Sequence, residues 1–182
     1  GGPRDVPQGP RVGPAVIEVV VEDLAFMPVD AVLRPASDTL DPVASVSSRM
    51  DQLAGPAFAE ERRVQSAMEV GSAVVTGSGD LAAQFVIHTV IRGDQSNATR
   101  DTVRRALTSA WQRAAAWGLE RIAGPPIGAG AGQLSLADAA ELMAETFAAH
   151  CRSGRPPTSL QIVAERDEER DIIEAAVQRV GR

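Results

Sequence analysis

Short runs of β-branched, apolar residues alternate along this chain with longer segments of helical periodicity. The strand-like runs cover residues 15–24, 29–37, 71–81, 84–91, 121–127 and 159–165. The helical segments cover residues 42–68, with a break near 54–56, and residues 99–118, 136–151 and 167–180. Strands that alternate with helices predict an α/β fold. We expect three α/β/α layers, with helices on both faces of a central mixed, largely parallel sheet.

Length and charge narrow the possibilities further. At 182 residues the chain suits a single domain, which we place at residues 15–182. Residues 1–14 are crowded with Gly and Pro, which predicts a disordered tail. The net charge of −6 argues against broad binding to a nucleic acid backbone. The sequence contains no Lys, which excludes a P-loop lysine and a Schiff-base lysine.

The cysteine and histidine content argues against a metal centre. A single cysteine, Cys151, excludes an internal disulfide and a cysteine-based zinc cluster, and it suits the reducing cytoplasm. His88 lies in a buried-strand pattern and His150 lies near a helix end. The separation of these two histidines does not match the spacing of metal ligands. We therefore expect no metal and no cofactor. No apolar run approaches the length of a membrane span and no signal peptide is visible, so neither a membrane nor export is expected.

The stretch PPIGAGAG at residues 125–132 is the strongest candidate for a ligand loop. It follows a short apolar run and leads into a helix that begins near Ser135. Glycines let backbone N–H groups approach an anion, and a helix N-terminus adds partial positive charge. From the spacing alone, a phosphate loop and a tight strand-to-helix turn are equally compatible. The rival GSGDLA at 77–82 fits a dinucleotide pattern, but a strand follows it, which favours a hairpin-like turn.

Several motifs together resemble those of the macrodomain family, the ADP-ribose-binding α/β/α module. VEDL at residues 21–24 is similar to the end of the family's first strand, and DAVLRPAS at 30–37 to its DAIVNAAN motif. GSAVVTGSGDL at 71–81 and AQFVIHTV at 83–90 match two further motifs in order. PPIGAGAG at 125–132 matches the family's second phosphate loop. The resemblance runs from about Ile17 to the end of the last helix.

The resemblance implies a ligand-binding role for particular residues. Asp23 would accept a hydrogen bond from the adenine amino group, with the Leu24 backbone alongside. Arg166 follows the last strand, where the family often carries an aromatic residue against adenine, and its guanidinium would stack there instead. The remaining residues with an implied binding role are Ser37, Val43, Ala44, Gly128, Ala129, Gly130, Ala131 and Gly132.

The first ligand loop departs from the family. Catalytic macrodomains carry an Asn at each end of the NAAN motif, followed by a Gly-rich loop. In this chain Arg34 and Ser37 stand in place of the two Asn residues, and LDPVASVSS at 40–48 stands in place of the Gly-rich loop. We therefore assign no catalytic residue. The resemblance implies a reader of ADP-ribose or a related adenine nucleotide, whose partners include ADP-ribosylated protein. There are two alternatives. The chain could be a hydrolase of ADP-ribosyl esters or of O-acetyl-ADP-ribose, or a degenerate scaffold for protein contacts. A 38–48 loop that leaves the cleft open would favour a ligand-binding protein over the scaffold.

Overall fold

The computed structural model describes residues 11–12, 15–130 and 133–181. The strands are β1 (Arg11–Val12), β2 (Ala15–Val21), β3 (Ala31–Ser37), β4 (Ala73–Gly77), β5 (Phe85–Arg92), β6 (Arg121–Gly124) and β7 (Ser159–Ala164). The helices are the 3-10 helix η1 (Leu24–Phe26), α1 (Ser45–Ala54), α2 (Pro56–Glu61), α3 (Arg100–Ala116), α4 (Leu136–Cys151) and α5 (Asp167–Val180).

The strands form one mixed sheet in the order β1-β2-β7-β6-β3-β5-β4. The five strands from β2 to β5 in this order run parallel, and β1 and β4 pair antiparallel with them at the two edges. Because parallel strands end at the same edge, the segments that follow β2, β3, β6 and β7 gather there.

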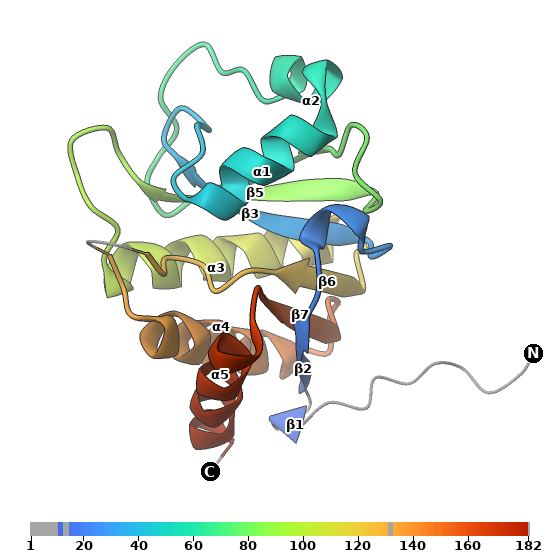
Figure 1. Ribbon diagram of the computed structural model, residues 1–182, viewed down its shortest axis with the longest axis vertical. Helices are drawn as coiled ribbons and strands as arrows, with labels where there is room; N and C mark the ends of the chain where they lie inside the picture. The colour runs from blue at the N-terminus through green and yellow to red at the C-terminus, as the bar shows by residue number, and fades with distance from the viewer. Residues whose placement is uncertain (1–10, 13–14, 131–132, 182) are drawn as a thin grey trace, which may run out of the picture.

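Helices cover both faces of this sheet (Figure 1), which confirms the three-layer fold. The helices α3, α4 and α5 enclose the larger apolar cluster, in which Trp111 is fully buried and donates its indole N–H to Thr146 Oγ1 at 2.9 Å. On the other face, η1, α1 and α2 contribute Leu24, Met50 and Phe58 to a second cluster. The sheet is therefore buried on both sides, as its apolar strands require.

The helices predicted at residues 136–151 and 167–180 have the predicted bounds, and β4 and β5 form the predicted antiparallel pair. The first long strand ends at Val21, earlier than predicted, because Asp23 caps η1 and accepts the N–H of Ala25. The helical segment predicted over 42–68 reduces to α1 and α2. Arg11–Val12, inside the predicted tail, pair with β2, and the rest of that tail lies outside the described residues.

A buried ion pair ties α1 to the centre of the sheet. Arg34 on β3 is 0% exposed, and its Nε and Nη2 donate to the two carboxylate oxygens of Asp51 on α1, each at 2.7 Å. Arg34 Nη1 donates to the carbonyl of Leu40 at 2.8 Å, and Arg62 Nη1 donates to the same oxygen at 3.1 Å. Leu40 has a φ of 62°, a left-handed conformation that costs a residue with a Cβ about 1 kcal/mol or more. The two guanidinium groups hold this turn in place.

His88 completes the cluster around Arg34. Its Nδ1 lies 3.2 Å from Arg34 Nη1, and its Nε2 lies 2.7 Å from Thr76 Oγ1, which donates to the Gly77 carbonyl. The neutral ring with its proton on Nε2 satisfies all of these bonds. Burial, followed by the nearby Arg34 charge, lowers the pKa of His88 to about 3. His88 is thus a paired core residue, as the strand pattern predicts.

Replacing Arg34 alone should leave the largely buried Asp51 without its bidentate partner, with only Arg62 Nε 3.5 Å from its Oδ2. We expect Arg34→Met to lower the free energy of unfolding by about 3 kcal/mol, measured by urea denaturation. The double variant Arg34→Met/Asp51→Leu should lose less, because neither charge is then left behind. Arg63→Met removes an exposed ion pair to Glu60 and serves as the control, with a change below about 0.5 kcal/mol. Equal losses for the single and double Arg34 variants would contradict this account.

The pH dependence of stability should report on His88. Because its pKa falls from 6.5 to about 3 on folding, the unfolded chain binds the extra proton between these values. Stability is therefore full above pH 6.5 and falls as the pH drops, with a slope approaching about 1.4 kcal/mol per pH unit. Urea unfolding between pH 7.5 and 5 measures this slope. His88→Gln should flatten it, and an unchanged slope in that variant would assign the effect to other groups.

Candidate functional site

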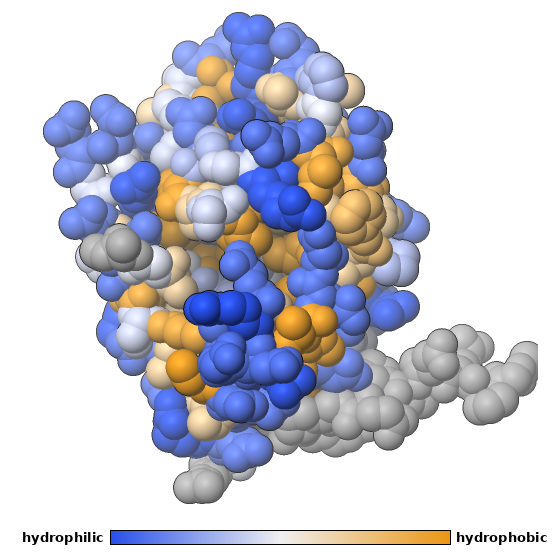
Figure 2. All heavy atoms as spheres, in the orientation of Figure 1, coloured by the Kyte–Doolittle hydropathy of each residue, from blue (hydrophilic) through white to orange (hydrophobic). Residues whose placement is uncertain are grey.

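A broad cleft of about 1280 Å³ opens at the edge where the parallel strands end. It is lined by residues 21–25, 43–46, 49–50, 125–126, 129–130, 133–136, 163–165, 169 and 173. These segments follow β2, β3, β6 and β7, so four neighbouring strands contribute to one site. In Figure 2 the middle of this face is hollowed and shows apolar side chains, with hydrophilic residues on both sides.

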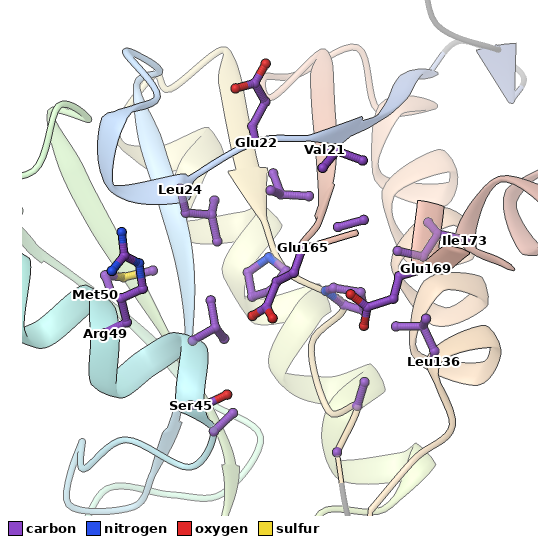
Figure 3. Close-up of a pocket in the computed structure, with 18 of the residues that line it drawn as sticks. Val21, Glu22, Leu24, Ser45, Arg49, Met50, Leu136, Glu165, Glu169 and Ile173 are labelled. Atoms are coloured by element: carbon purple, nitrogen blue, oxygen red, sulfur yellow. The ribbon is translucent and has the colours of Figure 1, made fainter. Parts of the chain in front are cut away.

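One end of the cleft, beyond β2 and β7, is acidic. Glu22 and Asp23 come from the segment after β2, and Glu165 and Glu169 from the segment after β7. Figure 3 shows the Glu165 carboxylate directed into the cleft, with Glu169 beside it. Among the described lining residues, Arg49 on α1 carries the one positive charge. This end is therefore suited to hydrogen-bond donors of a ligand.

Asp23 and Arg49 form an ion pair at the acidic end. Asp23 Oδ2 lies 2.5 Å from Arg49 Nη2, and its Oδ1 accepts the Ala25 N–H at 3.2 Å. The hydrogen bond from Arg49 is the main reason that the pKa of Asp23 lies below its usual range. Both side chains are partly exposed, so the pair contributes little to folding stability. Its effect is to fix the orientation of the carboxylate.

The opposite end, beyond β3 and β6, is rich in backbone amides. The first turn of α1 lines the cleft at Ser45 and Val46, and its N-cap residue, Ala44, makes no side-chain hydrogen bond. This turn holds no acidic residue, so no carboxylate competes for its N–H groups. The N-terminus of α1 therefore offers amides and partial positive charge to an anion.

The glycine loop is folded on itself beside that turn. Gly128 has a φ of 94° and Gly130 a φ of 153°, which only glycine adopts readily. Ala129 N–H donates to the Pro126 carbonyl at 3.2 Å, and Gly130 N–H donates to the Leu134 carbonyl at 3.3 Å. The N–H groups of Ala129 and Gly130, which the sequence suggested as ligand contacts, thus have hydrogen-bond partners within the loop. The first turn of α1 is the better source of free backbone amides for an anion.

The structure brings six of the predicted binding residues to the cleft, namely Asp23, Leu24, Val43, Ala44, Ala129 and Gly130. Three others, Ser37, Gly128 and Arg166, are not among the lining residues. Ala131 and Gly132 lie outside the described residues.

Ser37 and Arg166 have local structural partners. Ser37 Oγ accepts the backbone N–H groups of Thr39 at 3.3 Å and Asp41 at 3.2 Å, which closes the turn after β3. The Arg166 side chain is 72% exposed, and its Nε lies 3.7 Å from Glu169 Oε1. Both residues act in turns, and a binding role for them stays a prediction.

Sequence reasoning missed Ser45, Arg49, Gln133 and Glu169. Ser45 and Arg49 are four residues apart on α1 and therefore share a face. Gln133 directly follows the glycine run, and Glu169 lies in the first turn of α5. Within the described residues, Gln133 Oε1 and Glu169 Oε1 are buried without a hydrogen-bond partner. The helical spacing was visible in the sequence, but the contact of α1 with η1 was not.

Metal binding requires clustered ligand side chains, and thiol chemistry requires a reactive thiolate. Among the described residues, no group of three or more His, Cys, Asp and Glu side chains could hold a metal ion. Cys151 is buried in the α4 layer, and burial raises the pKa of its thiol to about 11. No helix in the described ranges is long and apolar enough to cross a membrane.

Comparison of the sequence with known families gives one clear match. The model of the Macro domain family matches residues 34–143. An O-acetyl-ADP-ribose deacetylase of Cronobacter sakazakii is 32% identical over 157 residues, which is 81% of this chain and 85% of that protein. A deacetylase of the same name from an Enterobacter species is 34% identical over 137 residues, or 71% of this chain and 76% of that protein.

Solved structures agree with this match. The Oceanobacillus iheyensis macrodomain with ADP superposes with a TM-score of 0.77 at 19% identity, covering 93% of this chain and 94% of that one. The Trypanosoma brucei macrodomain in complex with ADP-ribose gives a TM-score of 0.78 at 20% identity, covering 88% and 68%. At such identities the superposition establishes the fold.

Proposed function

Because the chain belongs to the macro domain family, we propose that its cleft binds ADP-ribose or a related adenine nucleotide, as a reader of ADP-ribosylated proteins. The observation that carries the proposal is the polarity of the cleft. Carboxylates line the end beyond β2 and β7, and backbone amides line the end beyond β3 and β6. A nucleotide diphosphate has the complementary arrangement, with amino donors on its base and negative charge on its phosphates.

The adenine lies at the acidic end in this proposal. Asp23 accepts a hydrogen bond from the exocyclic amino group, and the Leu24 backbone lies beside the ring. The carboxylate is ionised and therefore an acceptor at neutral pH, and its bond from Arg49 lowers the pKa of Asp23 further. Its contact with Ala25 N–H holds Oδ1 in place before any ligand arrives.

In this proposal the diphosphate lies against the first turn of α1 and beside Ala129 and Gly130 of the glycine loop. This chain lacks the glycine-rich first loop of the catalytic macrodomains, and the uncapped helix turn supplies amides at the same edge. Val43 and Ala44 lead into that turn and line the wall of the cleft. The 38–48 segment does not fill the cleft, and this favours a ligand site over a degenerate scaffold.

A second candidate is hydrolysis of an ADP-ribosyl ester, with water attacking the acyl carbon and ADP-ribose leaving. The relatives named O-acetyl-ADP-ribose deacetylase favour it. Arg34 and Ser37, which stand at the positions of the family's two asparagines, do not line the cleft and have partners elsewhere. This difference favours binding without turnover.

Calorimetric titration with ADP-ribose tests the binding proposal. We expect a micromolar dissociation constant for the wild-type chain. Asp23→Ala removes the acceptor for the base, and Gly130→Glu places a carboxylate in the cleft, so each should weaken binding at least tenfold, or about 1.4 kcal/mol. Asp101→Ala removes an exposed carboxylate outside the cleft and is the matched control. No heat from a wild-type protein with a cooperative thermal transition would refute the proposal.

A turnover assay separates the reader from the hydrolase. The protein is incubated with O-acetyl-ADP-ribose, and released acetate is measured beside the binding constant. We expect binding without acetate release above the uncatalysed rate, because Arg34 and Ser37, at the positions of the family's two asparagines, do not line the cleft. Release that disappears in Asp23→Ala, but not in Asp101→Ala, would instead assign the hydrolase.

A further inference from the structure

The described lining of the cleft contains no aromatic side chain. Proteins that bind nucleotides commonly stack the base on a flat group, and a guanidinium plane serves this purpose as well as an aromatic ring does. Arg166, the residue that the sequence suggested for this role, is not a lining residue. Among the described lining residues, the flat group that could stack on a base is therefore a guanidinium, which Arg49 alone carries.

Arg49 has the position that such a surface requires. It projects from α1 on one wall of the cleft, next to Met50, and Figure 3 shows Glu169 and Ile173 across the opening. Its contact with Asp23 brings it to the acidic end, where the proposed function puts the base. A base between these two walls would meet the guanidinium on one side.

The ion pair leaves the face of the guanidinium free. A hydrogen bond from Nη2 to a carboxylate uses the edge of the planar group and so occupies neither of its faces. The Arg49 side chain is 58% exposed, and no cation–π contact with an aromatic ring is present for it within the described chain. Asp23 thereby holds one nitrogen of the guanidinium at the acidic end of the cleft.

We propose that Arg49 is a further binding residue, whose guanidinium face stacks on the base of the bound nucleotide while Asp23 holds its edge. This inference rests on the proposed nucleotide binding. Stacking through the planar guanidinium and attraction through its positive charge predict different effects of substitutions at Arg49. Lys retains the charge and lacks the plane, whereas Tyr supplies the plane and lacks the charge.

Titration of ADP-ribose into five proteins tests the proposal. Relative to the wild type, Arg49→Ala and Arg49→Lys should each weaken binding about five- to tenfold, in the range of a partly exposed cation–π contact. Arg49→Tyr should stay within about twofold of the wild type. Arg179→Ala is the control, because its ion pair with Glu141 has similar exposure and lies outside the cleft. Thermal unfolding should be nearly unchanged in every variant, since both ion pairs are partly exposed.

The outcomes separate the possibilities. If Arg49→Lys binds like the wild type and Arg49→Tyr binds like Arg49→Ala, Arg49 acts as a charge, and stacking is refuted. If all three variants bind like the wild type, the inference fails and the proposed function stands. If the wild-type protein does not bind ADP-ribose, the proposed function fails and the inference fails with it.

Discussion

The bidentate contact between Arg34 and Asp51 determines where α1 can lie. A guanidinium that is fully buried in the central strand β3 must have its charge and its donors satisfied, and Asp51 meets this need from the middle of α1. The same group reaches the carbonyl of Leu40, so the turn after β3 is fixed by the interaction that fixes the helix. The N-terminus of α1 consequently faces the cleft at the edge where the parallel strands end.

The cleft is built from two kinds of polar group that this arrangement brings to one edge. Side-chain carboxylates follow the two strands on one side, and main-chain amides follow the two strands on the other. Arg49 connects these ends, because it lies one turn beyond the first turn of α1 and reaches Asp23. An altered first loop therefore need not abolish a nucleotide site, since a helix N-terminus supplies amides without glycine.

Local signals in the sequence predicted the fold well. The bounds of α4 and α5 followed from their apolar periodicity and, for α4, from Ser135, whose side chain accepts the Asp138 N–H. Local motifs marked Asp23 and Gly130, which do line the cleft, and their binding role stays a prediction. Arg34 was identified as a departure from the family, but its pairing joins residues 17 apart in different layers. The partnership of Arg49 with η1 is likewise a tertiary contact, which periodicity cannot reveal.

The attachment of α1 has a thermodynamic consequence for any ligand. Within two turns, α1 makes two bonds to the sheet and one to the start of η1. The Ser47 hydroxyl donates to the Pro35 carbonyl at 3.0 Å, and Asp51 accepts from Arg34. Arg49 donates to Asp23, the N-cap residue of η1. A glycine-rich loop would have to be ordered when a diphosphate arrives, at a cost in conformational entropy. In this chain the first turn of α1 is already ordered when the protein folds. If the proposed function holds, a nucleotide that docks on this wall should require little reorganisation of the backbone.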